Sequence, residues 1–489
     1  MLAASPAQPQ SILPLYVDLD GTLIKTDLLL ESLFLLLKKN PLYILVLPIW
    51  LLDGRAELKA KVAARVSVNY ELLPLNTEFL SFLRREKAKG RHLVLITASN
   101  ESAVAAFAQS LNLFDEVVGS DAHTNLKSKA KLQRINEMNT NAPFAYAGNA
   151  AADLPIWQQA QELIRVNCSK SLGQKLATAD KPLRDFDTPG SRWPRLWQAM
   201  RPHQWLKNGL LFIPLVLAHE LDDMHALQHA IIGILCFCLL ASSIYLLNDL
   251  LDLEADRRHA SKRSRPLAAG ELPIQHGAVA AIVLFVAALL LAHLQPLAFV
   301  EALGAYWLLT LFYSFLLKRI FLLDLFSLAS LYTLRLIAGA GAAGVIASPW
   351  LLVFSMALFF GLGAVKRVTE LVNRGNRETN EGNQAANLTL PGRAYTRQHR
   401  SLLTLMGTSA STTAVLVFLL YIYAEETVAL YSSPLSLWPI VGLLGLILFR
   451  VWRFAIIGKL QDDPVLFAIS DRPSQIATAL MFLVLWLAI

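Results

Sequence analysis

Apolar residues are distributed unevenly along the chain. After about residue 205 they form runs of about 20 residues, the length that crosses the hydrocarbon core of a bilayer. We count nine such runs, centred near residues 212, 239, 284, 307, 333, 357, 412, 444 and 481. Each run predicts a transmembrane helix, because a helix satisfies its own backbone hydrogen bonds in lipid. Residues 201–489 are therefore expected to form an all-α, polytopic bundle of nine transmembrane helices.

The first 200 residues have the pattern of an α/β protein. Short β-type runs at 15–17, 92–96 and 144–147 alternate with longer stretches suited to helices. Residues 28–52 are unusually apolar, but Lys38, Lys39 and Pro41 divide them into pieces too short to span a bilayer. Residues 171–200 are polar and contain several prolines. We expect a linker there, followed by a short interfacial helix anchored by Trp193 and Trp197.

Charge orients the membrane part. Of the 489 residues 55% are hydrophobic, and the formal net charge is +7. Lys and Arg are concentrated in the loops at 249–275, 366–400 and 453–472. The loops at 219–229 and 424–434 contain Asp and Glu but no Lys or Arg. By the positive-inside rule the basic loops are cytoplasmic, which places residues 1–200 in the cytoplasm and the protein in the cell (inner) membrane. These loops account for the net charge without a nucleic-acid partner; contact with anionic lipid is an alternative role for them.

Acidic residues are concentrated directly after the second apolar run. Asn248, Asp252 and Asp256 recur every four residues, so they share one face of a helix, and Asp249 lies beside them. Carboxylates this dense repel one another unless a cation lies between them. Mg²⁺ binds a few carboxylate oxygens together with substrate phosphates, so the cluster predicts a Mg²⁺-dependent diphosphate site. A solvated helix end with ordinary salt bridges is the alternative.

The N-terminal strands end in residues suited to phosphate chemistry. The run at 15–17 leads into Asp18-Leu19-Asp20-Gly21-Thr22. One carboxylate can attack phosphorus, the second can protonate the leaving group, and both can help to hold Mg²⁺. The second strand ends at Thr97, a hydroxyl placed to contact a phosphoryl oxygen. Lys127, Lys129 and Lys131 follow, and Asp153 comes after the third strand.

In this order the motifs resemble the haloacid-dehalogenase-like (HAD) phosphohydrolase superfamily along residues 14–168. The resemblance implies a Rossmannoid α/β domain in which Asp18 is the nucleophile and Asp20 the general acid/base. It makes Thr97 and Lys131 phosphate-binding residues, and Asp18, Asp20 and Asp153 ligands of Mg²⁺. The sequence departs from the family at Asn149, where an Asp usually binds the metal. A neutral ligand weakens a Mg²⁺ site, so a degenerate domain that only binds phosphate is the alternative.

The resemblance also assigns a structural role to the apolar insert at residues 28–52. It suits the helical cap that such enzymes carry over the site, at about residues 28–80. One face of the cap can lie on the bilayer, although a buried cap core explains the apolar residues as well. The expected domains are 1–170 (HAD-like), 171–200 (linker and interfacial helix) and 201–489 (membrane bundle).

Polar residues in the membrane half fall on one predicted side. Charges within apolar spans are costly and usually face a polar cavity. On the cytoplasmic side the expected substrate-binding residues are Lys207, Asn208, Tyr313, Lys318, Asp324, Arg335, Lys366, Arg367 and Glu370. Together with the acidic cluster they indicate one polar chamber. Lipid anchoring is the alternative for any single basic residue.

Across residues 200–489 the chain resembles the UbiA-type prenyltransferase superfamily. Nine spans and the motif Asn-Asp-x-x-Asp-x-x-x-Asp at 248–256 carry the resemblance. Usual members bind an isoprenyl diphosphate through Mg²⁺ on two Asp-rich motifs and alkylate an acceptor. Here the second motif is replaced by Lys-Arg-Val-Thr-Glu at 366–370. With Arg-Pro-x-Gln-Trp-x-Lys-Asn at 201–208 and Asp-Asp-Pro-Val at 462–465, this is similar to the branch that contains decaprenyl-phosphate phosphoribosyltransferases.

The resemblance implies transfer of a 5-phosphoribosyl group from phosphoribosyl diphosphate to a polyprenyl phosphate. Asn248, Asp249, Asp252 and Asp256 would hold Mg²⁺, with Asp249 and Asp252 closest to the chemistry. The HAD-like domain would then remove the 5-phosphate from the lipid product. Two alternatives remain: an aromatic prenyltransferase that uses an isoprenyl diphosphate in a quinone or haem pathway, and a transporter for a lipid phosphate. Paired repeats, which transporters usually show, are not obvious in the sequence.

Overall fold

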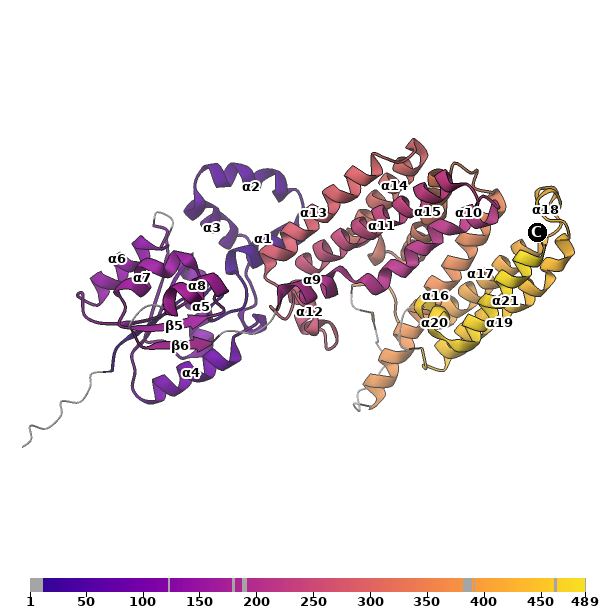
Figure 1. Cartoon of the computed structure of the whole chain (residues 1–489). Coiled ribbons are helices and arrows are strands. Elements are labelled where there is room, and N and C mark those ends of the chain that lie inside the picture. The colour runs from indigo at the N-terminus through magenta and orange to yellow at the C-terminus, as the bar shows by residue number, and fades with distance from the viewer. Residues whose placement is uncertain are drawn as a thin grey trace, which may run out of the picture. The chain divides into compact units, whose positions relative to one another are not determined.

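A computed structural model describes residues 12–121, 124–177, 181–186, 191–380, 389–390, 392–460 and 464–488. The chain forms two compact units (Figure 1). One contains Met1–Arg201 and Ser242–Val283, and the other contains Pro202–Ala241 and Leu284–Ile489. Helix α11 (Met224–Leu251) passes from the second unit into the first.

A parallel sheet organises the first unit. Its six strands lie in the order β3-β2-β1-β4-β5-β6, and every neighbouring pair is parallel. The strands are β1 (Leu15–Val17), β2 (Leu93–Asn100), β3 (Glu116–Ser120), β4 (Ala145–Gly148), β5 (Glu162–Val166) and β6 (Leu183–Phe186). The three strands expected from the sequence are the central three of this sheet, β2, β1 and β4. The α/β class is thereby confirmed.

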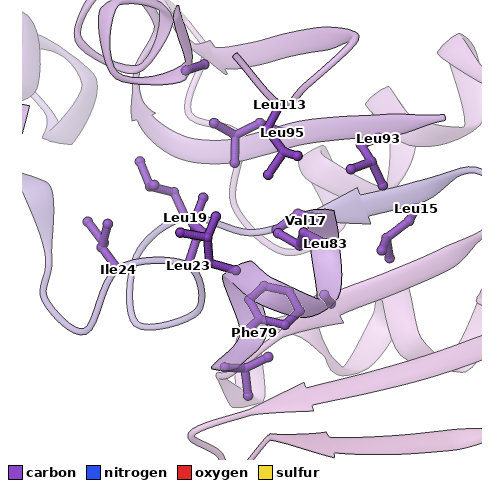
Figure 2. Close-up of a cluster of buried hydrophobic side chains, with 14 of the residues drawn as sticks. Leu15, Val17, Leu19, Leu23, Ile24, Phe79, Leu83, Leu93, Leu95 and Leu113 are labelled. Atoms are coloured by element: carbon purple, nitrogen blue, oxygen red, sulfur yellow. The ribbon is translucent and has the colours of Figure 1, made fainter. Parts of the chain in front are cut away.

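Both faces of the sheet are buried, as is usual for a parallel sheet. Leu15 and Val17 of β1 point to one face, where they join a core that includes Phe79 and Leu83 (Figure 2). Tyr16 points to the other face and packs in a second core. The first core is covered by α4 (Thr77–Ala88) and α5 (Glu101–Leu111), and the second by α6 (Lys129–Met138), α7 (Leu154–Gln159) and α8 (Lys170–Ala177).

Helices fill the segment between β1 and α4, as expected for a cap. They are α1 (Leu28–Lys39), α2 (Tyr43–Leu52) and α3 (Arg55–Ala63), followed by the 3-10 turn η1 (Tyr70–Leu72). Trp50 and Val62 are buried in a small core of their own. Leu45 and Leu52 of α2 are 70% and 88% exposed. The apolar insert therefore forms a cap core and also leaves an apolar face on α2.

The segment expected to be a linker contains a sixth strand. β6 pairs with β5 along its whole length, with Leu163 opposite Leu183. Four residues at a sheet edge are too short to show a strand period, which is why the sequence pattern did not predict β6. A short helix is present there as α9 (Arg192–Met200), with Trp193 and Trp197 77% and 55% exposed on it. Its location at a membrane interface remains a prediction.

Seven helices in the described part of the chain are long and apolar enough to cross a membrane. They are α11, α13 (Ile274–Ala292), α14 (Leu297–Phe315), α15 (Leu323–Ala343), α16 (Pro349–Asn380), α17 (His399–Tyr421) and α19 (Trp438–Ile456), the last extended by η7 (Pro434–Leu437). They coincide with the second to eighth expected spans. An all-α membrane part is therefore supported.

The first and ninth expected spans differ from continuous long helices. Residues near 212 form a 3-10 helix, η3 (Pro202–Phe212), and then the short α10 (Ile213–Leu217). Pro214 lies in the first turn of α10, a position where proline fits a helix because the missing N–H has no helical partner. The ninth falls on α21 (Arg472–Ala488), 17 residues long, after α20 (Pro464–Ser470). Nine spans therefore remain a prediction.

Candidate active sites

The N-terminal motif lies at the carboxyl edge of the sheet. The Asp18 amide donates to the carbonyl of Ala147 at 2.9 Å, so the motif directly continues strand β1 between β2 and β4. The chain runs from β1 to β2 and β3 on one side and then returns to β4 on the other side of β1, so the strand order reverses at this point. Such a switch point is where open α/β sheets bind ligands.

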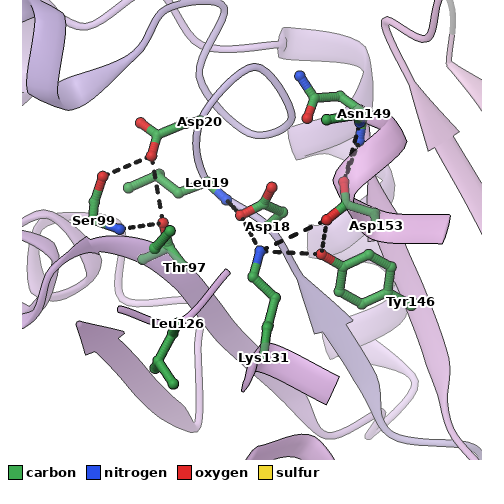
Figure 3. A network of polar contacts seen from close by, with 12 residues as sticks. Asp18, Leu19, Asp20, Thr97, Ser99, Leu126, Lys131, Tyr146, Asn149 and Asp153 are labelled. Atoms are coloured by element: carbon green, nitrogen blue, oxygen red, sulfur yellow. Dashed lines mark hydrogen bonds and ion pairs between the residues drawn. The ribbon is translucent and has the colours of Figure 1, made fainter. Parts of the chain in front are cut away.

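A chain of polar contacts links Asp18 to Asp153 (Figure 3). Lys131 Nζ donates to Asp18 Oδ1 at 2.8 Å and to the hydroxyl of Tyr146 at 3.2 Å. That hydroxyl donates to Asp153 Oδ1 at 2.9 Å, while Asp153 Oδ2 accepts from the amides of Asn149 and Ala150. Lys131 is therefore positioned beside the expected nucleophile, and Asp153 holds the loop after β4 in place.

Asp20 is held by hydroxyls and a backbone amide. Ser99 Oγ donates to Asp20 Oδ2 at 2.6 Å, and the amide of Leu28 donates to Oδ1 at 2.8 Å. Thr97 Oγ1 is farther from Oδ2, at 3.5 Å, and accepts from the amide of Ser99. Ser99 thus makes the closer contact, although Thr97 is the residue that the motif order selects.

Burial changes the acidity of this site. Loss of solvation raises the pKa of Asp18 to about 7 and that of Asp20 to about 6, although Lys131 opposes the shift at Asp18. Burial alone would lower the pKa of Lys131, but Asp18 and Asp153 raise it. Lys131 therefore stays charged. A carboxyl group with a pKa near 6 can give and take a proton near neutral pH, which suits the role expected of Asp20.

Asn149 lies against the turn of the motif. Gly21 has φ +73°, and a Cβ at this position would lie 2.0 Å from Asn149 Nδ2. Glycine is needed here both for the backbone conformation and for the close approach of Asn149. Asn149, the position at which the sequence departs from the family, thus lies directly beside the Asp18–Asp20 turn.

These residues line a cavity of about 1140 Å³ within the first unit. Its walls include Asp18, Asp20, Lys131, Asn149 and Asp153. Lysines from other elements reach it as well: Lys59 of the cap donates to the carbonyl of Ala98 at 2.5 Å and to Asn125 Oδ1 at 3.0 Å. Eight Lys or Arg and five Asp or Glu line the cavity, so it favours an anionic ligand.

The acidic segment of the membrane half is also well ordered. Helix α11 ends at Leu251 and α12 (Leu253–Arg258) begins after Asp252, but the hydrogen bonds from Asp252 N to Asn248 O and from Asp256 N to Asp252 O keep the helical spacing. Arg265 Nη1 binds Asp249 Oδ1 at 3.1 Å and Asp256 Oδ2 at 2.6 Å.

Two further basic side chains form ion pairs with these acids. Arg201 also binds Asp249, and Lys38 of the cap binds Asp252 at 2.7 Å. Burial raises the pKa of Asp256, and Arg265 opposes this shift. The buried pair is thus Asp249 and Asp256, joined by Arg265, whereas Asp252 faces the cap.

The residues expected to bind Mg²⁺ offer the oxygen ligands that this ion prefers, but they are not grouped around one point. Carboxylate and amide oxygens, the ligands Mg²⁺ prefers, occur at both sites. Within the described ranges, however, no three His, Cys, Asp or Glu side chains are grouped so as to hold a metal ion. In the acidic segment guanidinium and ammonium groups hold the carboxylates, and in the cavity protein donors engage both oxygens of Asp153.

A separate ionic network lies in the second unit around Arg367. Its guanidinium is fully buried and binds Asp324 Oδ2 through Nε at 2.6 Å and both oxygens of Glu370 through Nη1 at 2.9 Å. Tyr313 donates to Asp324 Oδ1 at 3.0 Å, and Arg393 binds the same oxygen at 3.0 Å. A buried charge is stable only when it is paired in this way.

Arg335 forms a second buried network in this unit. Its Nε donates to Asn208 Oδ1 at 3.0 Å, its Nη2 donates to the hydroxyl of Tyr306 at 3.0 Å, and it stacks on Tyr306 and Tyr332. Lys207 lies over the Tyr332 ring at 5.8 Å. Lys318 and Lys366 are half-buried. Asp462 and Asp463 lie outside the described residues.

The structure thus places the expected residues in the hydrolase cavity and the acidic segment of the first unit, and in the Arg367 and Arg335 networks of the second unit. Sequence reasoning did not select Tyr146, Tyr306 or Arg393, which complete these networks. An aromatic residue in a buried strand or helix gives no local signal of a polar role. One chamber joining the acidic segment to the Arg367 network remains a prediction.

Comparison with known proteins assigns the membrane part. Residues 210–486 match the model of the UbiA prenyltransferase family. The chain belongs to this family. Residues 15–157 match the haloacid dehalogenase-like hydrolase family, so the chain joins a HAD-like hydrolase domain to a UbiA domain.

Relatives extend the comparison. The chain is 37% identical over 475 residues to the uncharacterized protein y4nM of Sinorhizobium fredii, which covers 96% of this chain and 90% of that protein. It is 39% identical over 181 residues to the decaprenyl-phosphate phosphoribosyltransferase of Mycolicibacterium smegmatis, covering 36% of this chain and 57% of that protein. A UbiA homologue from Archaeoglobus fulgidus, solved with DMAPP and Mg²⁺, aligns with 60% of the chain (99% of its own) at 18% identity and a TM-score of 0.42.

Proposed function

We propose that this UbiA-family protein transfers a 5-phosphoribosyl group from phosphoribosyl diphosphate to a polyprenyl phosphate, and that its HAD-like domain hydrolyses the 5-phosphate of the lipid product. In this proposal the protein lies in the cell membrane with the HAD-like domain in the cytoplasm. The similarity to decaprenyl-phosphate phosphoribosyltransferases over 181 residues supports the choice of donor and acceptor.

The observation that carries the transferase proposal is the buried guanidinium of Arg367. It stands where usual family members have a second Asp-rich motif. Together with Arg393 it brings two positive charges to Asp324 and Glu370. The N–H donors of Arg367 are taken up by these carboxylates and by Tyr313, so Arg367 would position them. Arg393, which is partly exposed, is the guanidinium of this network that can contact a substrate phosphate.

In the transferase, Asn248, Asp249, Asp252 and Asp256 would hold Mg²⁺, whose positive charge would favour departure of diphosphate. Arg201 and Arg265 bind Asp249 in the structure, so in this proposal they exchange that carboxylate for phosphate oxygens when Mg²⁺ binds. The polyprenyl phosphate oxygen forms a bond to the anomeric carbon as the bond to diphosphate breaks. This acceptor is already ionised and needs no general base.

In the HAD-like domain, an oxygen of Asp18 attacks phosphorus while the bond to the ribose C5 oxygen breaks. Asp20 gives its proton to that leaving oxygen. Water then attacks the phosphorus of the aspartyl phosphate, Asp20 takes the proton, and phosphate leaves. Lys131, 2.8 Å from Asp18 Oδ1, neutralises phosphate charge throughout.

The test uses the full-length protein with a polyprenyl phosphate, Mg²⁺ and phosphoribosyl diphosphate that carries one label in the ribose and a different label in the 5-phosphate. We expect a labelled lipid, and labelled inorganic phosphate only when Asp18 is intact. The Asp18→Asn variant should make the lipid and leave its 5-phosphate in place. Labelling of the lipid from an isoprenyl diphosphate instead would contradict the donor, and equal phosphate release by Asp18→Asn would contradict the hydrolase.

A further inference from the structure

The cavity that holds Asp18 has walls from outside the HAD-like fold. Besides residues of the sheet and cap, it is lined by Arg192 and Arg195 of α9, by Glu271, and by Gln275 and His276. The last two belong to the first turn of α13, a candidate membrane span. The cavity wall therefore reaches the first turn of a candidate membrane helix, the part of such a helix that is expected near lipid headgroups.

Two neighbouring surfaces agree with this location. Trp193 and Trp197 stand one helical turn apart on α9 and are exposed, as is common for side chains in the headgroup region. The apolar face of α2 is exposed as well, and Leu51 of this helix lines the cavity. A ligand in the cavity can thus remain joined to a lipid.

The arginines at this rim are available for an anion. Arg192 donates to His276 Nε2 at 3.1 Å, and a ring nitrogen that accepts this hydrogen bond is neutral. Arg195 pairs with Glu271 at 3.2 Å, but both side chains are more than one-third exposed. An exposed ion pair contributes little stabilising free energy, so a phosphate can readily replace Glu271 as the partner of Arg195.

We propose that Arg192 and Arg195 form a second anion site at the rim of the hydrolase cavity, which binds the phosphodiester of a lipid-linked phosphosugar while its terminal phosphate lies at Asp18 and Lys131. This inference rests on the proposed hydrolase function. A cavity of about 1140 Å³ is far larger than one phosphate requires. The rim site makes the enzyme selective for substrates with two phosphates.

Cys168 provides a readout that does not depend on turnover. It lines the cavity and is partly exposed, whereas Cys236 and Cys238, the other two cysteines of the chain, are buried. Protection of Cys168 from iodoacetamide, followed by mass spectrometry of its peptide, reports occupancy of this cavity alone. The full-length Asp18→Asn protein in neutral detergent keeps the bound ligand intact.

The probes are ribose 5-phosphate and ribose 1,5-bisphosphate. We expect the bisphosphate to protect Cys168 at about 30-fold lower concentration, as expected for charge-assisted hydrogen bonds from the rim. Adding Arg192→Ala and Arg195→Ala should abolish this difference. The matched control Arg84→Ala, an exposed arginine of α4 outside the cavity, should keep it.

Equal protection by the two probes, or a difference that survives the double substitution, would overturn the rim site. Protection by phosphatidylglycerol micelles as strong as that by the bisphosphate would assign the rim to bulk lipid headgroups and also overturn it. The proposed hydrolase function fails separately, if the protein with Asp18 intact releases no phosphate from the lipid product while the thirtyfold difference persists.

Discussion

Glu31 of the cap helix α1 and Arg257 of α12 form a buried, two-pronged ion pair, although 226 positions separate them. Arg257 Nη1 lies 3.1 Å from Glu31 Oε2 and Nη2 lies 2.5 Å from Oε1. Thr26 donates to the same carboxylate, and Arg257 Nε donates to the carbonyl of Ala268. The cap is thereby fastened directly to the segment that follows the acidic motif.

Replacing Glu31 by Ala should destabilise this unit strongly. The substitution leaves Arg257 buried without its carboxylate, at a cost of about 3–5 kcal/mol. Thermal unfolding of the full-length protein in detergent, with limited proteolysis of the cap, measures the effect. The control is Glu254→Ala, which removes a more exposed i,i+4 pair with Arg258 and should cost less than about 1 kcal/mol. Equal effects of the two would contradict the buried pair's importance.

Magnesium binding at the hydrolase site should depend on pH. Because burial raises the pKa of Asp18 to about 7, a proton competes with the metal below pH 7. The Mg²⁺ concentration that gives half-maximal phosphate release should rise about tenfold per pH unit below 7 and level off above it. An aspartate with an ordinary pKa would show no change between pH 6 and 8, and that outcome would be evidence against the shift.

Restoring the family's carboxylate at position 149 should strengthen the same metal site. Asn149→Asp adds a charged ligand beside Gly21 and Asp18 without a change of size. We expect half-maximal phosphate release at a Mg²⁺ concentration at least about tenfold lower at pH 8. Asn136→Asp, a substitution on α6 outside the cavity, is the matched control. No change in the Mg²⁺ requirement would mean that position 149 does not reach the metal.

In the membrane part, Arg367→Lys should impair phosphoribosyl transfer more than tenfold. Lysine keeps the charge but cannot make the several fixed hydrogen bonds to Asp324 and Glu370. Initial rates at saturating and limiting phosphoribosyl diphosphate separate lost binding from a slower chemical step. Arg319→Lys, at an exposed position of η5 (Leu317–Arg319), should leave the rate unchanged. A variant with the full rate would contradict a phosphate-binding role for this network.

Asp249→Asn should lower the transfer rate about 100-fold or more, because it removes a carboxylate held by two arginines next to the expected leaving group. Glu254→Gln, two residues after Asp252 and paired with Arg258, serves as the control. Labelled lipid formation from phosphoribosyl diphosphate measures both. If Asp249→Asn retains the rate of the unaltered protein, the acidic segment does not take part in catalysis.

The sequence predicted those parts of the sites that local motifs encode. Asp18 and Asp20 directly follow a strand that the apolar pattern predicted. Lys131 lies on α6 after β3, a strand that the pattern did not predict, so only the order of the motifs selected it. The pairing of Asp249 with Asp256 through Arg265, and of Asp252 with Lys38, depends on how distant segments fold back. Sequence spacing placed the acids on one face but contained no information on which cations would meet them.

The ends of the membrane part were harder to predict for a related reason. Apolar composition near residue 212 is the same for a long helix and for η3 followed by α10, since hydropathy does not register where the hydrogen-bond pattern changes. In the folded chain Asn208 of η3 accepts a hydrogen bond from the buried guanidinium of Arg335, 127 positions away. Only the folded chain shows that partner.

Strand β6 also limits how far the hydrolase can travel. Five residues, 187–191, separate its end from α9, so this connection extends at most about 20 Å. If α9 lies on the bilayer, as the sequence predicts, a domain tied this closely to it would meet a lipid headgroup at an effective concentration of the order of millimolar. Weak intrinsic affinity would then suffice for rapid processing, and a headgroup made by the same polypeptide would be consumed before it spread laterally through the membrane.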